Sequence, residues 1–530
     1  MICSWHFLRL WVLLAVLVAG GVPPCMAAPP VKSLFHNEDC TNLFYFHRIP
    51  AGKAGELIDH YVDVMAQAGV TTFLCNTNAR RTNYRSRVWE SFWDGYDPAG
   101  GDDQPFLATI PRNDVHGYRN LIANMLAVHQ QGIDYPARVI QRCRHDAISP
   151  WITLRMNDRH FTETPEHPFH GSFWKKNLQL CRKNCPGSYA LCLDYAHQEV
   201  RDYYRALVVE TLDRYDIDGL ELDFMREPYL FSAGKEAEGA PILTGWIREV
   251  RKLVDATAAK RGHPIRLGVR VPSRPETALG MGLDAIAWAK EGLIDLLVVT
   301  PRWATLEFDM PLGHWRQLLG SSSVTLAGGL EILCRPAGEP PVVATPELAT
   351  GAAVSVLSEG ADAVYLFNYF QDACPGWPLP VYQKTLKAMT SLDSLLKQPR
   401  CVAITYRDVT APGEDYRPLL PVTGKEMAFS LKLGPMPDKG WRCELRIGVT
   451  PRPTAPAPTV LVNGKPCKAL KEWTTADGLR WVSFVVPMTA LKDTGAQVVT
   501  VVSADQKELT VRQVQMGLRP ADAAATACAR

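Results

Sequence analysis

Two carboxylic acids lie in an apolar run, where charge is costly. Residues 215–227 read YDIDGLELDFMRE, and Glu221 and Asp223 stand within this run. Removing a charge from water is expensive unless the charge is paired or used, so buried strands normally avoid such residues. Two acids on alternate strand positions point to the same face, and paired carboxyl groups can perform acid–base or nucleophilic chemistry. The pair is therefore a catalytic candidate if the fold brings it to a site.

The surrounding sequence predicts alternating helices and buried strands. Short apolar runs follow helix-like stretches that end in Gly or Asp, and the runs are continuously apolar, which is typical of a parallel sheet covered by helices. Eight such runs are expected: 41–48, 68–78, 149–158, 215–225, 265–273, 291–301, 323–332 and 359–369. Eight strand–helix units predict an α/β fold, a closed (β/α)8 TIM barrel over residues 33–398. A doubly wound open sheet is the alternative, but the first strand lacks a Gly-rich phosphate turn.

Strand alternation places both acids toward the barrel interior. In GLELDFM, Leu220, Leu222 and Phe224 face the helices, whereas Glu221 and Asp223 face inward. Asp223 is one layer nearer the carboxyl end, where barrel enzymes have their active sites. The alternative is structural: Glu221 pairs with a buried arginine and only stabilises the barrel.

The stretch YDIDGLELDFMR resembles the fourth-strand signature of barrel glycoside hydrolases. It is closest to the largely uncharacterised glycosyl-hydrolase-like (β/α)8 barrel proteins of bacteria, and LDYAHQEVRDYY and LRMNDRHF strengthen a match over most of residues 40–370. The chitinase-type pattern Asp-Gly-x-Asp-x-Asp-x-Glu is similar, but its terminal acid would fall on Met225, which cannot donate a proton. In the clan with an acid/base on strand four and a nucleophile on strand seven, the nucleophile would fall near Glu331. Two preceding glycines would let a sugar approach the backbone.

The resemblance implies a glycoside hydrolase that cleaves an oligo- or polysaccharide. Such cleavage needs two carboxyl groups, one to protonate the leaving oxygen and one to attack or to activate water. The expected catalytic residues are Asp223, with Glu221 as its alternative, and Glu331. An exposed loop acid is the other interpretation of Glu331.

Polar and aromatic residues follow the ends of the other expected strands. Sugar hydroxyls need donors and acceptors, and apolar sugar faces stack on rings, so this set is expected to bind substrate. Individually, each could be a turn residue. The candidates are His47, Asn76, Asn78, Arg155, Asn157, Asp158, His160, Arg226, Arg270, Arg302, Trp303, Asn368 and Tyr369.

Two insertions, residues 77–115 and 158–194, follow expected strand ends, where a barrel builds its site. The second insertion contains Cys181, Cys185 and Cys192. Their spacing matches no standard zinc pattern, so we expect a local disulfide or free thiols and no metal.

The C-terminal region changes in character after residue 400. Residues 400–515 contain short alternating runs separated by turns such as Asn463-Gly464, which predicts an antiparallel β-sandwich. Residues 516–530 are expected to be a flexible tail.

The N-terminal residues 1–28 read as a secretory signal peptide. Arg9 precedes an apolar run, and small residues lead to a cut near Ala27 or Ala28, which predicts a secreted or periplasmic protein. A membrane anchor is the alternative, but the run is short for a span, and no later segment is apolar enough. The net charge of +2 over 530 residues gives no indication of nucleic-acid binding. No cofactor is expected.

Two other functions remain open. A metal-dependent barrel hydrolase or isomerase could use Asp158, His160, Glu221 and Asp223 as ligands, although an early His-x-His pair is missing. A non-catalytic carbohydrate-binding barrel stays open as well, because Met225 stands where the chitinase-type pattern has an acid. Fold alone cannot decide among these functions.

Overall fold

The computed structural model describes residues 34–522, except 186, 303, 372–375, 438 and 453–454. The expected signal peptide (1–28) and Trp303 lie outside the described residues.

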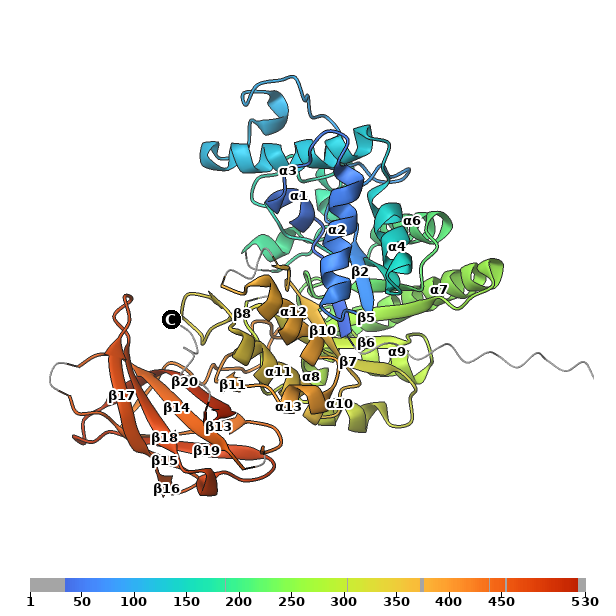
Figure 1. The fold of residues 1–530 in the computed structure, drawn as a ribbon. Helices are drawn as coiled ribbons and strands as arrows, with labels where there is room; N and C mark the ends of the chain where they lie inside the picture. The colour runs from blue at the N-terminus through green and yellow to red at the C-terminus, as the bar shows by residue number, and fades with distance from the viewer. Residues whose placement is uncertain are drawn as a thin grey trace, which may run out of the picture. The chain divides into compact units, whose positions relative to one another are not determined.

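The N-terminal part of the described chain is a closed barrel of parallel strands, as the sequence predicts (Figure 1). The strands are hydrogen-bonded in the order β1-β10-β7-β6-β5-β4-β3-β2. Their bounds are β1 (Leu34–Asn37), β2 (Thr72–Asn76), β3 (Ser149–Arg155), β4 (Gly219–Asp223), β5 (Arg266–Pro272), β6 (Leu296–Thr300), β7 (Thr325–Glu331) and β10 (Ala363–Phe367). Nearly every strand residue is buried, because helices cover the outer face and side chains fill the interior.

Helices connect the strands and supply the outer layer. They are α1 (Asn42–Phe46), α2 (Ala54–Gln67), α3 (Arg112–Gln130), α4 (Tyr135–His145), α5 (Ser172–Lys176), α6 (Gln198–Arg214), α7 (Glu236–Arg261), α8 (Pro275–Gly280), α9 (Ala285–Lys290), α10 (Leu312–Leu319), α11 (Pro346–Ser358), α12 (Leu379–Ala388) and α13 (Leu392–Leu396). Helix α6 buries Val200, Tyr204 and Leu207 at three- and four-residue steps. Helix α7 ends at Gly262, whose φ of 77° is the left-handed cap conformation that glycine adopts without strain.

The first strand is not the one that the sequence predicts. The run 41–48 forms helix α1, and strand β1 lies upstream at 34–37. Strand β1 closes the barrel by pairing with both β2 and β10. His47 therefore caps the end of a helix and does not end a strand. This correction moves the first strand end to Asn37, and the residues that follow it become candidates for the site.

Antiparallel sheets follow the barrel, as expected. One sheet contains β11 (Arg400–Ala403), β20 (Leu509–Pro520), β14 (Trp441–Val449), β18 (Arg480–Val486) and β17 (Lys468–Thr474), with β12 (Val422–Gly424) beside β20. The other contains β13 (Glu426–Lys432), β19 (Ala496–Val502), β15 (Thr459–Val462) and β16 (Lys465–Pro466). Buried and exposed residues alternate along β13, so one of its faces packs against the core. Strand β20 continues to Pro520, past residue 515, where we expected the sheet to end.

Two short strands form a hairpin after β7, namely β8 (Leu333–Cys334) and β9 (Val342–Val343). The cysteines of the described residues, including Cys181, Cys185 and Cys192, have free thiols. Within the described part of the chain, no helix has the length and apolar character of a membrane span.

Candidate active site

Glu221 belongs to a polar network inside the barrel. Its Oε1 atom accepts hydrogen bonds from the Thr153 hydroxyl at 2.7 Å, the Tyr365 hydroxyl at 2.8 Å and the Asn37 amide at 3.2 Å. Burial and the neighbouring charge of Asp223 raise the pKa of Glu221 to about 7. The donors come from three different strands, so Glu221 ties the barrel interior together.

Asp223 forms an enclosed ion pair with Arg270. The Asp223 Oδ2 and Arg270 Nη1 atoms are 3.2 Å apart, and the two side chains are 1% and 0% exposed. The Met225 N–H donates to the other carboxylate oxygen at 2.8 Å, and the Arg270 guanidinium lies 4.0 Å from the centre of the Phe367 ring. Asp223 is also absent from the residues that line the 360 Å³ cleft at the carboxyl end of the barrel. Asp223 therefore fits a structural role better than the catalytic role that we expected.

Glu331 lines a cleft at the carboxyl end of the barrel. The cleft has a volume of about 360 Å³ and is lined by Asp39, Thr41, Asn42, Tyr45, Glu331, Ile332, Leu333, Val343, Asn368 and Phe370. Burial raises the pKa of Glu331 to about 8, although hydrogen bonds from Asn368 and from the Ile332 N–H oppose this shift. Glu331 is therefore protonated at neutral pH and able to donate a proton.

The loop after β10 fixes the position of Glu331. Asn368 has a φ of 62°, and its amide is 3.2 Å from each carboxyl oxygen of Glu331. The Tyr369 hydroxyl donates to the Glu331 carbonyl at 3.2 Å. The structure thus brings together Glu331, Asn368 and Tyr369, all of which the sequence singles out, but Asn368 and Tyr369 orient the acid.

Asp39 is a second carboxylate on the same cleft, and the sequence reasoning missed it. It follows β1 and accepts hydrogen bonds from the Thr41 N–H at 3.0 Å and the Thr41 hydroxyl at 2.9 Å. Its other oxygen is 2.5 Å from Arg155, and its side chain is 17% exposed. Burial acts to raise the pKa of Asp39, but Arg155 and Arg226 outweigh it, and the pKa lies well below its usual range. Asp39 is therefore ionised.

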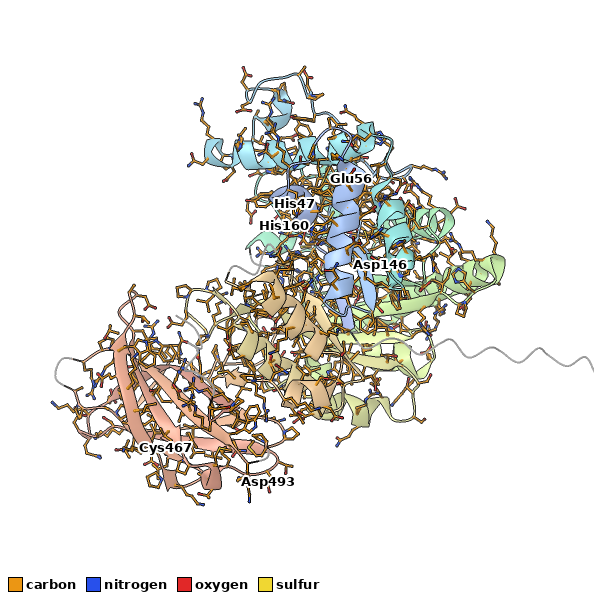
Figure 2. All side chains as sticks on the ribbon, viewed as in Figure 1. His47, Glu56, Asp146, His160, Cys467 and Asp493 are labelled. Atoms are coloured by element: carbon orange, nitrogen blue, oxygen red, sulfur yellow. The ribbon has the colours of Figure 1, made fainter. Side chains whose placement is uncertain are left out.

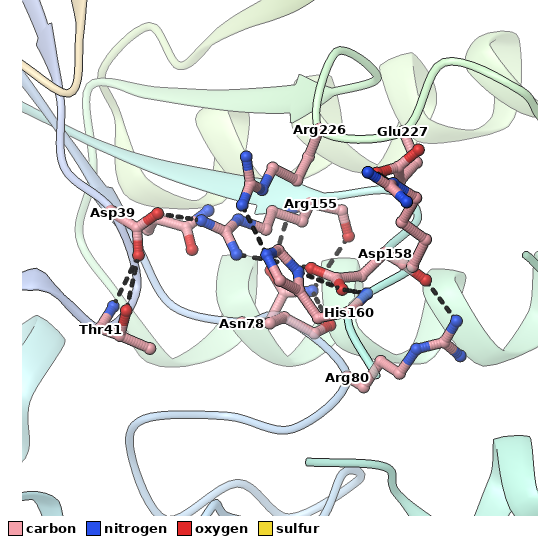
Figure 3. Close-up of polar contacts among 12 residues, drawn as sticks. Asp39, Thr41, Asn78, Arg80, Arg155, Asp158, His160, Arg226 and Glu227 are labelled. Carbon is pink, nitrogen blue, oxygen red and sulfur yellow. Dashed lines mark hydrogen bonds and ion pairs between the residues drawn. The ribbon is translucent and has the colours of Figure 1, made fainter. Parts of the chain in front are cut away.

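A cluster of charged side chains surrounds the ends of β3 and β4 (Figure 3). His160 Nδ1 is 2.7 Å from Asp158, and His160 Nε2 is 2.7 Å from Arg226. Because the guanidinium can only donate, Nε2 accepts and Nδ1 donates. Arg155 also approaches Asp158, at 3.5 Å. The structure thus gathers Arg155, Asp158, His160 and Arg226, as the sequence predicts for strand ends.

Glu227 extends this cluster and is another residue that sequence reasoning missed. It pairs with Arg302, and the Arg159 Nε atom is 3.2 Å from the same carboxylate. The Tyr189 ring lies 4.9 Å from the Arg159 guanidinium and 5.8 Å from that of Arg302. Glu227 adjoins the quoted strand-four motif, but its partner lies after β6, so only the fold places the pair together.

Other predicted binders have local structural roles. Asn76 donates to the Thr153 carbonyl at 3.3 Å, Asn78 donates to the Arg155 carbonyl at 3.0 Å, and Asn157 donates to the Leu193 carbonyl at 2.8 Å. These amides join neighbouring strand ends and loops. His47 lies at the end of α1 (Figure 2), and its carbonyl accepts from Asn124 at 2.6 Å. None of these four lines the 360 Å³ cleft.

The two glycines before Glu331 are needed for packing. A Cβ atom at Gly328 would collide with Val356, and one at Gly329 would collide with Thr300. We expected these glycines to admit a sugar, but internal side chains occupy the space. Among the described residues, no group of three or more His, Cys, Asp or Glu forms a possible metal site.

Comparisons with known proteins find distant structural likeness only. No protein-family model and no curated sequence matches the chain. A cycloisomaltooligosaccharide glucanotransferase from Paenibacillus sp. aligns with a TM-score of 0.33 at 8% identity, over 91% of this chain and 57% of the other. The α-L-fucosidase isoenzyme 1 from Paenibacillus thiaminolyticus aligns with a TM-score of 0.33 at 13% identity, over 89% and 96%. The PgaB (BpsB) glycoside hydrolase domain from Bordetella bronchiseptica gives a TM-score of 0.38 at 9% identity, over 67% and 99%.

The chain spans just over half of the length of the first of these proteins. At such TM-scores, the likeness carries no inference about activity. The chain is distantly similar in structure to glycoside hydrolases, and no sequence family is shown.

Proposed function

We propose that the protein is a glycoside hydrolase in which Glu331 is the general acid and Asp39 is the partner carboxylate. One observation carries the proposal: two carboxyl groups with opposite pKa shifts line one cleft at the carboxyl end of the barrel. Two acids whose environments push their pKa values apart can divide the acid and base roles at one pH.

The proposed reaction follows from these protonation states. Protonated Glu331 donates its proton to the glycosidic oxygen, so that the leaving sugar departs as an alcohol. Ionised Asp39 either attacks the anomeric carbon or removes a proton from the attacking water. Arg155 supports both possibilities because it keeps Asp39 ionised. The separation of the two carboxyl groups in the substrate complex would decide between retention and inversion.

The remaining cleft residues suit a sugar. Thr41, Asn42 and Asn368 offer hydroxyl and amide groups, and Tyr45 and Phe370 offer rings for the apolar faces of a pyranose. Tyr45, which also lines the cleft, is 60% exposed. This mixture of a few polar groups with rings is typical of ligand pockets.

The test is hydrolysis of a broad panel of oligo- and polysaccharides, measured as new reducing ends. Glu331→Gln and Asp39→Asn should each reduce kcat/KM by roughly 10²- to 10⁴-fold. Asp309→Asn, which changes an acid that is 69% exposed, is the matched control and should leave turnover unchanged. Circular dichroism would establish that each variant is folded. Full activity of either cleft variant would overturn the assignment.

A non-catalytic carbohydrate-binding barrel is the second candidate. It is favoured by the ion pair between Asp223 and Arg270, because this pair holds the carboxylate of strand β4 in a structural contact. Such a protein would bind glycans with measurable affinity but would release no reducing ends from any member of the panel.

Export is part of the proposal and is supported by the sequence of residues 1–28. A secreted or periplasmic location would give the enzyme access to polysaccharides outside the cytoplasm.

A further inference from the structure

The charged cluster at the ends of β3 and β4 contains more guanidinium groups than carboxylates. Its carboxylates are those of Asp39, Asp158 and Glu227. Its guanidinium groups are those of Arg80, Arg155 and Arg226, which Figure 3 labels, and of Arg159 and Arg302. Within this set of side chains the positive charges outnumber the negative ones, and Asp408 acts on Arg302 from outside the set. In a site with limited access to water, an excess of positive charge attracts anions strongly.

The carboxylates are already committed to other arginines. Asp39 pairs with Arg155 at 2.5 Å, and Asp158 lies 3.5 Å from the same arginine. Glu227 forms ion pairs with both Arg302 and Arg159. Each of the three acids thus forms its ion pairs with guanidinium groups other than that of Arg226.

Arg226 forms no ion pair with an acid of the described residues, although Asp39 and Asp158 lie near enough to act on its charge. Among the described residues, no carboxylate oxygen lies within 4.0 Å of its guanidinium nitrogens. Its Nη2 atom donates to the ring nitrogen of His160 at 2.7 Å, and its Nε atom is buried without a hydrogen-bond partner. Burial and the like charge of Arg155 lower the pKa of Arg226 by more than the nearby charges of Asp39 and Asp158 raise it. A guanidinium in this environment is stabilised by any anion that reaches it.

Neighbouring contacts hold Arg226 in place. Asp158 accepts from both the backbone N–H and the Nδ1 of His160, at 2.8 and 2.7 Å, so the His160 ring is oriented with Nε2 toward Arg226. The His160 side chain is 36% exposed, so solvent reaches this part of the cluster. Asp39 connects the cluster to the cleft, because it lines the cleft and pairs with Arg155.

We propose that Arg226 binds a negatively charged group of the substrate, and that the protein acts on acidic glycans whose sugars carry a carboxylate or a sulfate. The inference rests on the proposed function and names its substrate class. Arg226 does not line the cleft itself but belongs to the cluster that Asp39 joins to it. The anion would form a charge-assisted hydrogen bond to the free donors of the guanidinium, a geometry that suits both carboxylate and sulfate oxygens. The positive charge of Arg226 would select such glycans over neutral ones.

The test is a binding titration with the full chain and three matched sets of oligosaccharides. One set carries uronate groups, one carries sulfate esters, and one has neutral sugars of the same lengths. Wild-type protein should bind one of the acidic sets at least roughly tenfold more tightly than the neutral set. The affinity should fall as salt is raised from 0.05 to about 0.5 M. The set that binds identifies the anion.

Arg226→Gln should remove roughly ten- to hundredfold of the affinity for the acidic set and leave neutral binding within about twofold. Arg226→Lys, which keeps the charge but loses the planar donor pair, should retain an intermediate affinity. Arg248→Gln removes the same charge from the surface of α7, where the side chain is 47% exposed, and should change nothing. If Arg226→Gln fails to fold, Arg226→Lys and the salt dependence of the wild type decide.

Equal affinity of the wild type for acidic and neutral sets would overturn the inference, as would unchanged acidic binding in Arg226→Gln. Failure of the proposed function gives a different pattern. Acidic glycans would then bind through Arg226 without being hydrolysed. Conversely, hydrolysis of neutral glycans that is unaffected by Arg226→Gln would retain the proposed function and reject the substrate class.

Discussion

Replacing Asp223 separates a structural from a catalytic role for the strand-four acid. In Asp223→Asn, the fully buried Arg270 loses the carboxylate that lies 3.2 Å away. At that distance, with an effective dielectric constant of about 20, the direct attraction is roughly 5 kcal/mol before desolvation is subtracted. Removing one partner of a buried pair costs about 3–5 kcal/mol.

The structure favours the lower part of that range. Arg270 keeps the Phe367 ring at 4.0 Å and the Arg302 carbonyl at 3.4 Å. We therefore expect the free energy of unfolding to fall by about 3 kcal/mol. Denaturant unfolding followed by tryptophan fluorescence measures this change. The exposed-pair control Asp309→Asn should change the free energy of unfolding by less than about 1 kcal/mol.

Removing both charges is the internal check. The double variant Asp223→Leu with Arg270→Met leaves no unpaired charge, so it should cost less than the sum of the two single changes. Turnover per folded molecule should fall far less in Asp223→Asn than in Glu331→Gln. A stable Asp223→Asn protein without turnover would refute the structural role and restore Asp223 as a catalytic acid.

The other predictions concern pH, packing and processing. The kcat/KM of the wild type should fall as the pH rises through about 8, because Glu331 must be protonated to act, and a pH–rate profile without that limb would contradict this role. Since the pKa of Glu331 is raised from 4.5 to about 8 on folding, its contribution to stability is complete below pH 4.5 and is lost as the pH rises through 8. Glu331→Gln should flatten that part of the curve of unfolding free energy against pH. Gly329→Ala should destabilise the barrel by about 1–3 kcal/mol through its clash with Thr300, and an unchanged melting temperature would show that the space is open. N-terminal sequencing of the exported protein should find a mature chain that begins just after Ala27 or Ala28, whereas recovery of the intact N-terminus would reject cleavage.

The sequence predicts the barrel well because its buried strands are continuous apolar runs that recur after helices. Seven of the eight expected runs contain barrel strands. The prediction of the first strand was wrong because residues 41–48 are aromatic and apolar, as in a strand. Strand β1, in contrast, contains the polar residues His36 and Asn37. Both are buried, and burial lowers the pKa of His36 to about 4. Closure of the barrel thus overrode local propensity.

The same error hid half of the candidate site. Asp39 follows β1, so a first strand placed at 41–48 left it outside any strand end. Glu331 and Asn368 were accessible to sequence reasoning because their strands were correctly assigned. The Asp223–Arg270 pair joins neighbouring strands in register, so pairing of β4 with β5 could have indicated it. Which acid each arginine of the charged cluster pairs with depends on the conformation of the loops, and sequence periodicity does not encode that conformation.

The central claim is that Glu331 supplies a proton to the leaving group, and leaving-group dependence tests it most directly. A glycoside with a dinitrophenyl leaving group needs little protonation, whereas a natural glycan needs it fully. We predict that Glu331→Gln loses roughly 10²- to 10⁴-fold of kcat/KM on the natural glycan but retains most of it on the dinitrophenyl glycoside. Equal losses on both substrates, or no loss on the natural glycan, would contradict the proposed role of Glu331.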